Sequence, residues 1–145
     1  MSPDTGAVGR WAPVVVWAAL IFLASTSWFT GSRTESVVVP LLAWLFPHAS
    51  LQTLETMHTI VRKSAHFSEY LIFGLLIARA LRDARGWLWR HAVLAVLLAA
   101  SYAVTDELHQ HFVPGRTAAV GDVVIDAIGA TVGQLWLGLR ALRPS

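Results

Sequence analysis

Cysteine is absent from the 145-residue sequence, which excludes disulfide bonds, thiol catalysis and zinc sites built on cysteine. Charged residues are also scarce, at 14% of the chain, against about 25% in a typical soluble domain. Hydrophobic residues make up 55%, more than a soluble fold of this length can bury. The composition therefore predicts a membrane protein with a single domain over residues 1–145.

The basic residues point to the same class of protein. The formal net charge is +2 and the isoelectric point is near 9.7, values that could suggest a nucleic-acid partner. However, Lys and Arg lie in short clusters beside apolar runs, as they do at the ends of membrane helices. We therefore expect membrane lipids as partners and no nucleic acid.

The first apolar run, residues 11–29, is long enough for one membrane-spanning helix. It could instead be the apolar region of a signal peptide, with Ala24-Ser25-Thr26 as a poor cleavage site. The next apolar stretch, residues 37–46, is interrupted by Pro40 and is too short to span. It is interpreted as a re-entrant or interfacial helix.

Three further helical patterns follow. One covers residues 51–84 with its membrane part at 67–81, the next runs from about 87 to 110, and the last from about 118 to 140. Pro114-Gly115 marks a turn between the last two. The expected fold is an all-α polytopic membrane bundle of about four transmembrane helices, with a short interfacial or re-entrant helix after the first.

The distribution of basic residues predicts the orientation. With both termini in the cytoplasm, seven of the 11 Lys and Arg residues fall on the inner side and four on the outer side. Cytoplasmic loops carry the excess of positive charge in membrane proteins. A multi-pass protein with two cytoplasmic termini is therefore predicted.

Polar residues occupy one face of each of the last three helices. Successive residues of a helix are 100° apart, and on this spacing the polar residues of each helix share one side. Ionisable groups within a membrane turn toward protein or a water-filled cavity, so these sides are expected to face inward. The three faces comprise Arg62, Lys63, His66, Glu69 and Tyr70; Tyr102, Asp106, His109 and Gln110, with Glu107 at the edge; and Asp122, Asp126, Gly129 and Gly133. The two glycines suggest that the last face packs closely against a neighbouring helix.

Topology places these faces on the same side of the membrane. One polar pocket near the outer surface is predicted from Lys63, His66, Glu69, Asp106, Glu107, Gln110, Arg116, Asp122 and Asp126. A carboxylate, Asp106 or Asp122, is expected within reach of the His66 imidazole. A plainer interpretation is that these groups form ion pairs that only fasten helices, and that Arg62 is a snorkelling anchor.

The residue types suggest a division of roles. Candidate catalytic groups are His66, Asp106, Glu107 and Asp122, because His and carboxylates serve as general acids and bases. Candidate substrate-binding residues are Lys63, Glu69, Tyr70, Gln110, Arg116 and Asp126. Lys63 and Arg116 could hold a phosphate. No metal or other cofactor is assigned, since no ligand spacing such as His-Glu-x-x-His is present, although the His and acidic residues could bind a divalent ion.

Three blocks of residues resemble the VanZ-like family of small bacterial membrane proteins. They are Lys63-x-x-His66-Phe67-x-Glu69-Tyr70, then Asp106-Glu107-Leu108-His109-Gln110-x-Phe112-x-Pro114-Gly115-Arg116, and finally Asp122-x-x-x-Asp126-x-x-Gly129-x-x-x-Gly133. Together they fall within residues 62–133. Arg62 departs from the pattern, which has an acid before the lysine, so Lys63 is expected to pair across the bundle.

The resemblance implies a location in the bacterial cytoplasmic membrane and a connection to the cell envelope. The family takes its name from an accessory protein of glycopeptide-resistance clusters, linked with teicoplanin, so antibiotic resistance is an association rather than a reaction. Three functions fit the residues. The first is an enzyme acting on a lipid or lipid-linked headgroup, and the second is a binding or translocating protein whose pocket holds an anionic headgroup or relays protons; as a transporter it would need a homo-oligomer. The third is a structural partner protein.

Overall fold

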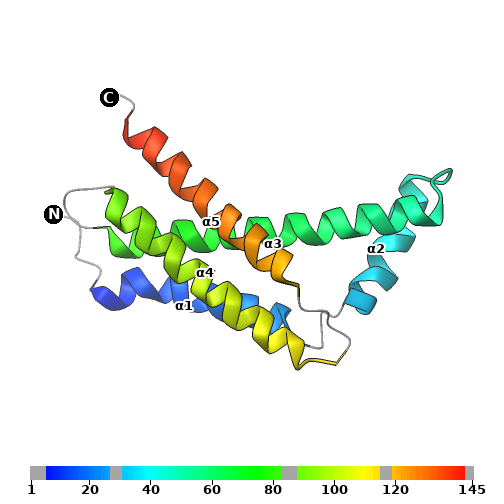
Figure 1. The fold of residues 1–145 in the computed structure, drawn as a ribbon, viewed down its shortest axis with the longest axis horizontal. Helices are drawn as coiled ribbons and strands as arrows, with labels where there is room; N and C mark the ends of the chain where they lie inside the picture. Colours follow the sequence, from blue (N-terminus) through cyan, green and yellow to red (C-terminus); the bar gives the residue numbers. More distant parts are fainter. Residues whose placement is uncertain (1–5, 27–30, 83–87, 115–118, 143–145) are drawn as a thin grey trace.

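The computed structural model describes residues 6–26, 31–82, 88–114 and 119–142, and the regular structure within these ranges is entirely α-helical. Five helices follow one another along the chain (Figure 1): α1 (Ala7–Ala24), α2 (Gly31–Leu45), α3 (Leu51–Leu81), α4 (Trp89–His111) and α5 (Val120–Ala141). Their order agrees with the sequence patterns, and the all-α prediction is confirmed.

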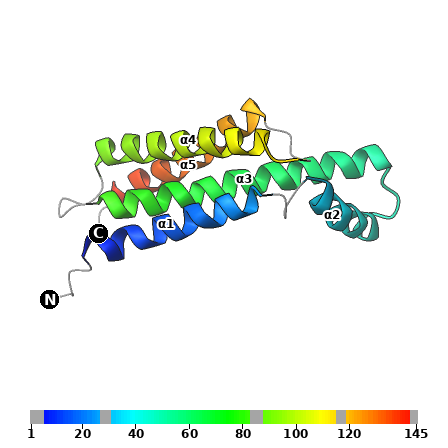
Figure 2. The same ribbon diagram turned by 90° about the horizontal axis from the view of Figure 1, so that it is seen from below.

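The helix α3 is central to the fold, because it contacts each of the other four helices. Its C-terminal half packs among α1, α4 and α5, while its N-terminal half projects beyond them and carries α2 (Figures 1 and 2). The start of α1 and the end of α5 lie at the same end of the bundle in both views. The end of α4 and the start of α5 are therefore at the opposite end, toward α2.

Small residues allow the helices to approach closely. On α4, the buried face follows a helical repeat of alanines at positions 92, 95, 99 and 103, each at most 8% exposed. The same face continues into Asp106, Glu107 and Gln110, which are also buried. The buried face of α4 thus carries small apolar side chains along most of its length and polar side chains at its C-terminal end.

Glycines bring α5 against α3, as the stripe of small and acidic residues predicts. A Cβ atom at Gly129 would collide with the backbone carbonyl of Phe67 on α3. At Gly133 it would lie 3.2 Å from the carbonyl oxygen of Leu71. The acids Asp122 and Asp126 share this stripe and consequently face α3.

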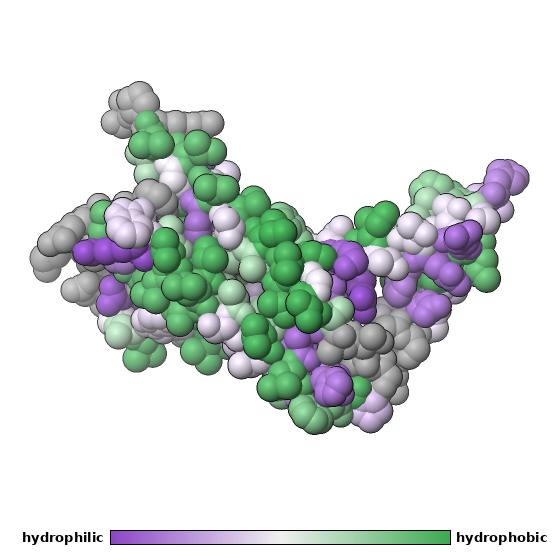
Figure 3. Space-filling model, viewed as in Figure 1, coloured by the Kyte–Doolittle hydropathy of each residue, from purple (hydrophilic) through white to green (hydrophobic). Residues whose placement is uncertain are grey.

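The outer surface of the bundle is apolar. Large hydrophobic side chains such as Leu20, Leu97 and Leu135 are at least half exposed, and Figure 3 shows apolar residues over much of the bundle between more hydrophilic ends. Soluble monomers rarely expose apolar patches of this extent. The surface is that of a membrane protein.

Three helices, α1, α4 and α5, are long and apolar enough to cross a membrane. The central helix α3 does not meet this criterion over the described residues, and α2 is a shorter apolar helix. Pro40 lies inside α2, so the interruption expected there does not end the helix. The start of α3 is fixed by Ser50, whose hydroxyl accepts a hydrogen bond of 3.2 Å from the Thr53 N–H.

Candidate functional site

Buried polar side chains from four helices meet where α4 ends and α5 begins. We call this group the polar cluster; its members are Ser25, Arg62, Lys63, His66, Asp106, Glu107, Gln110, Asp122 and Asp126. Most of the residues that the sequence predicts for a shared pocket are therefore close together. They converge because α3 runs antiparallel to α4 and parallel to α5, which brings the middle of α3 beside one end of each.

Asp122 is held by two cations of α3. Its carboxylate lies 3.3 Å from an Arg62 guanidinium nitrogen and 3.2 Å from the Lys63 ammonium, and the aspartate side chain is only 1% exposed. Lys63 thus pairs across the bundle as expected. Arg62 is more than a snorkelling anchor, because it makes an ion pair of its own. A buried carboxylate needs such partners, since desolvating it alone costs several kcal/mol.

His66 is buried and its Nδ1 lies 3.2 Å from Oδ1 of Asp126. The direct partner is therefore Asp126 rather than either of the two expected acids, although Asp122 offers an oxygen within 4.8 Å of the imidazole. Asp126 is fully buried, and its Oδ2 makes no hydrogen bond within the part of the chain that the structure describes.

Asp106 is the centre of a network that joins α1 to α4. The Ser25 hydroxyl donates a hydrogen bond of 2.5 Å to Oδ1 of Asp106, and Nε2 of Gln110 donates one of 2.9 Å to Oδ2. Ser25 was not among the predicted site residues. Its position at the end of an apolar run is the one signal in the sequence, and that position is equally expected of the end of a membrane helix or of a poor cleavage site.

Glu107 connects α4 to the start of α5. Its Oε2 accepts a hydrogen bond of 2.8 Å from the N–H of Ala119, the N-cap residue of α5, whose own side chain cannot cap the helix. A carboxylate at this position also interacts favourably with the positive end of the helix dipole. The other oxygen, Oε1, has no hydrogen-bond partner among the described residues.

Two of the predicted binding residues stand apart from the cluster. Tyr70 is completely buried in the core, with its ring edge-on to Phe73, and its hydroxyl has no hydrogen-bond partner among the described residues. Glu69 is half-buried, and its backbone carbonyl accepts a hydrogen bond from the Trp17 indole. Arg116, with the Gly115 that precedes it, lies outside the described residues.

A cavity of about 180 Å³ reaches the cluster from the side of α2. A single water needs about 10–15 Å³ of such space, so the cavity can hold a small polar group. Its walls come from α1, α2, α3 and α4 and include Ser25, Arg62, His66, Glu69, Asp106 and Gln110. One arginine, the imidazoles of His58 and His66, the buried carboxylate of Asp106 and the half-buried Glu69 thus line the same space. The guanidinium suits binding of a phosphate, and the imidazoles and carboxylates suit proton transfer.

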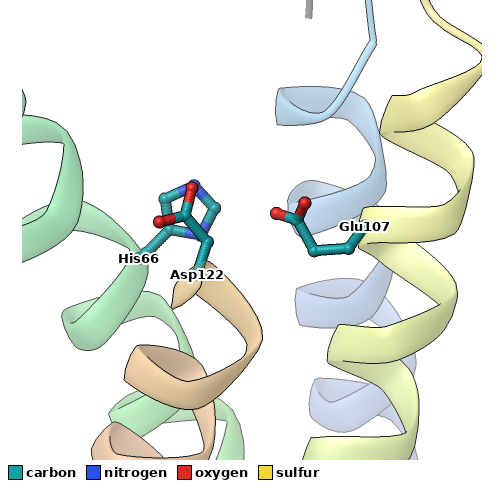
Figure 4. A group of neighbouring side chains, drawn as sticks. All are labelled: His66, Glu107 and Asp122. Atoms are coloured by element: carbon teal, nitrogen blue, oxygen red, sulfur yellow. The ribbon is translucent and has the colours of Figure 1, made fainter. Parts of the chain in front are cut away.

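Three buried side chains face one another beside this cavity (Figure 4). His66 of α3 and Asp122 of α5 lie together, and Glu107 of α4 points its carboxylate toward them. One donor atom from each lies within 4.8 Å of the other two. Among the described residues, this is the group whose spacing could hold a metal ion.

Comparison with known proteins agrees with the sequence motifs. A family model described as VanZ/LLP1 matches residues 11–140, which includes all five helices of the structure except the ends of α1 and α5. Neither the curated proteins nor the solved structures contain a match to the chain.

Proposed function

The chain belongs to the VanZ/LLP1 family, and on this basis we propose that its polar cluster binds or acts on an anionic headgroup in the bacterial cytoplasmic membrane. The headgroup carries a phosphate and belongs to a membrane lipid or to a lipid-linked envelope component. The proposal rests on the chemistry of the cluster and on the apolar surface that surrounds it.

Four transmembrane segments are proposed. Three are α1, α4 and α5, and the fourth is the C-terminal half of α3, residues 67–81. Most of this half of α3 is buried or half-buried among its neighbours, and its exposed polar residues, Ser68 and Arg79, lie near its two ends. At 1.5 Å per residue the 31 residues of α3 exceed a bilayer core of about 30 Å. Its first turns and α2 are therefore placed at the outer interface.

The distribution of positive charge supports an outward-facing cluster. Among the described residues, the bundle end that holds the start of α1 and the end of α5 carries five arginines, at positions 10, 79, 82, 90 and 140, whereas Arg62 and Lys63 lie at the cluster. Over the whole sequence the predicted division is seven basic residues to four. The positive-inside rule then places the termini in the cytoplasm and the cluster near the outer leaflet. Headgroups of that leaflet would reach the cavity between α1, α2 and α3.

One observation carries the proposal: Arg62 lines the same cavity as buried His66 and Asp106. Guanidinium groups bind phosphate through two parallel hydrogen bonds. Beside it, an imidazole paired with a carboxylate can accept or release a proton. Lys63, one residue further along α3, adds a second cation next to the cavity.

A purely structural role is the second candidate, because most of the charges already have partners within the bundle. Ser25 with Asp106 and Lys63 with Asp122 join α1 to α4 and α3 to α5. If the cluster only fastens helices, its substitution will unfold the protein without any effect on ligand binding.

Lipid binding tests the proposal. The purified protein is mixed with equal amounts of phosphatidylglycerol and phosphatidylcholine, and bound lipid is identified by native mass spectrometry. We expect phosphatidylglycerol in excess, and at least about tenfold weaker binding for Arg62→Gln, because a hydrogen bond to a charged group contributes about 1.5–3 kcal/mol. Arg79→Gln is the matched control, since Arg79 is an exposed arginine near the other end of α3.

Equal binding of the two lipids would contradict the proposal, as would equal losses in the two arginine variants. Incubation of the bound lipid with the protein then separates catalysis from binding. A new lipid product that disappears in His66→Gln indicates an enzyme, whereas unchanged lipid indicates a binding protein.

A further inference from the structure

His66, Glu107 and Asp122 come from three different helices, yet their donor atoms converge. One atom of each lies within 4.8 Å of the others, and the residues are 8%, 6% and 1% exposed. Side chains that only fasten helices form pairs, as Asp122 does with Lys63. Two of the three donors are carboxylates, which repel each other unless positive charge lies close to them. In the present arrangement Arg62 and Lys63 supply that charge at Asp122.

Glu107 supplies a second, independent observation. Its Oε2 is satisfied by the Ala119 N–H, but Oε1 is buried and has no hydrogen-bond partner among the described residues. Buried carboxylate oxygens are normally paired or coordinate metals. In Figure 4 this carboxylate points at His66 and Asp122. Glu107 therefore has one carboxylate oxygen without a hydrogen-bond partner among the described residues, and its carboxylate faces two further possible ligands.

The third observation is the hydrogen bond between His66 and Asp126. With Asp126 ionised, its carboxylate only accepts hydrogen bonds, and the proton shared by the two groups is then on Nδ1 of His66. A neutral ring then has its lone pair on Nε2. Metal-binding histidines almost always donate their other N–H to a carboxylate or carbonyl in this way.

From these observations we propose that His66, Glu107 and Asp122 bind one divalent metal ion of the zinc or manganese type. One imidazole and two carboxylates are typical ligands of such ions, and three protein ligands leave a coordination position open. Two carboxylates neutralise a divalent charge. Asp126 orients His66 and does not itself coordinate the ion.

Binding requires small movements. Ligand atoms about 2 Å from an ion lie roughly 3.3 Å apart, so donors that are within 4.8 Å of one another need to move inward by at most about 1 Å. Arg62 and Lys63 contact Asp122 in the present arrangement, with side chains 31% and 41% exposed. They are free to turn toward solvent or toward an anionic ligand when the ion takes their place at Asp122.

The role of the ion, though not its binding, rests on the proposed function. An ion at this position lies beside the cavity that contains His66 and Asp106, where its open position can accept a phosphate oxygen. The cluster would then bind an anionic headgroup through a metal ion together with Arg62.

Metal titration of the full-length protein in detergent, without added lipid, tests the site. The protein is first treated with a chelator, and ZnCl2, MnCl2 and MgCl2 are then titrated separately by calorimetry. We expect one equivalent of Zn²⁺ or Mn²⁺ to bind and Mg²⁺ to bind more weakly, because Mg²⁺ prefers oxygen ligands. Failure of both Zn²⁺ and Mn²⁺ to saturate one site would overturn the proposal.

Three matched substitutions locate the ion. Glu107→Gln should weaken binding by at least about 100-fold, and Asp126→Asn by about 10–100-fold, as for residues that orient a ligand. Asp106→Asn is the control: it removes an equally buried neighbouring carboxylate whose oxygens already have partners, and it should change affinity by less than about tenfold. Equal effects of Glu107→Gln and Asp106→Asn would show a nonspecific charge effect and contradict the site.

Electron paramagnetic resonance of bound Mn²⁺ provides a measurement that does not depend on the stability of these variants. Coupling to an imidazole nitrogen is expected in the wild type and should be lost in His66→Gln. The absence of nitrogen coupling in the wild type would exclude His66 as a ligand. Because the metal titration contains no lipid and the lipid-binding measurement contains no added metal, failure of the headgroup proposal and failure of the metal proposal give different results.

Discussion

The hydroxyl of Ser25 donates a hydrogen bond of 2.5 Å to the buried carboxylate of Asp106. The two residues are at the C-terminal ends of α1 and α4, and Nε2 of Gln110 lies 3.4 Å from the same hydroxyl. This contact fixes the end of the first membrane helix to the polar cluster. An apolar helix whose only partner is lipid would lack such a connection.

Substitution of Ser25 by alanine is therefore expected to destabilise the protein by about 1.5–3 kcal/mol, because it removes a hydrogen bond to a buried charged group. Thr26→Ala is the matched control, since among the described residues the Thr26 hydroxyl bonds to the carbonyl of Leu23, three positions back in the chain. We expect a change below about 0.5 kcal/mol there. Unfolding in a denaturing detergent titration measures both, and equal values would show that the Ser25 contact contributes nothing specific.

Gly129→Ala should destabilise the packing of α5 on α3. The added methyl group would collide with the backbone carbonyl of Phe67, and overpacking of this kind costs about 1–3 kcal/mol. Gly121→Ala is the control on the same helix, because no atom lies within 4 Å of its added Cβ. Comparable melting temperatures of the two variants would mean that α3 and α5 are not in close contact.

The orientation in the membrane can be read by cysteine labelling, because the native chain contains no cysteine. Val120 and Leu142, at opposite ends of α5, are 83% and 80% exposed. We expect Val120→Cys to react with a membrane-impermeant maleimide in intact cells, and Leu142→Cys only after permeabilisation. The reverse pattern would place the polar cluster at the cytoplasmic face.

His66→Gln tests whether His66 does more than support the fold. Glutamine can still donate a hydrogen bond to Asp126, so the melting temperature should fall only slightly, while any lipid turnover should be lost because an amide does not transfer protons. His109→Gln is the control: His109 is half-buried, and its ring lies 4.6 Å from that of Phe22 on α1 rather than beside Asp126. Retained turnover in His66→Gln would leave this residue a purely structural or metal-binding role.

Hydrophobic patterning predicted the helices well, including the long third helix that begins at Leu51. It also predicted which side of each helix carries the polar residues. The fourth membrane segment proposed above is less clear from hydropathy, because α3 has polar residues on one side and apolar residues on the other. Enclosure by the other helices, rather than mean hydropathy, gives that half of α3 an apolar environment.

The partners within the cluster could not be predicted in the same way. The periodicity of one helix gives the angle at which each side chain leaves it, and so it correctly assigned His66 to the inner face. It does not give the axial offset between two helices. A shift of one turn, about 5.4 Å, exchanges Asp122 for Asp126 opposite the imidazole.

The sequence by itself determined that this chain is an apolar helical protein of the VanZ/LLP1 family, with acids, histidine and cations on the inner faces of its helices. Only the tertiary structure decided that Asp126 is the partner of His66, that Ser25 bonds to Asp106, and that Glu107 reaches the start of α5. The physical reason is that these contacts depend on how far one helix slides along another. That distance is set by close packing, as where Gly129 meets the backbone of Phe67.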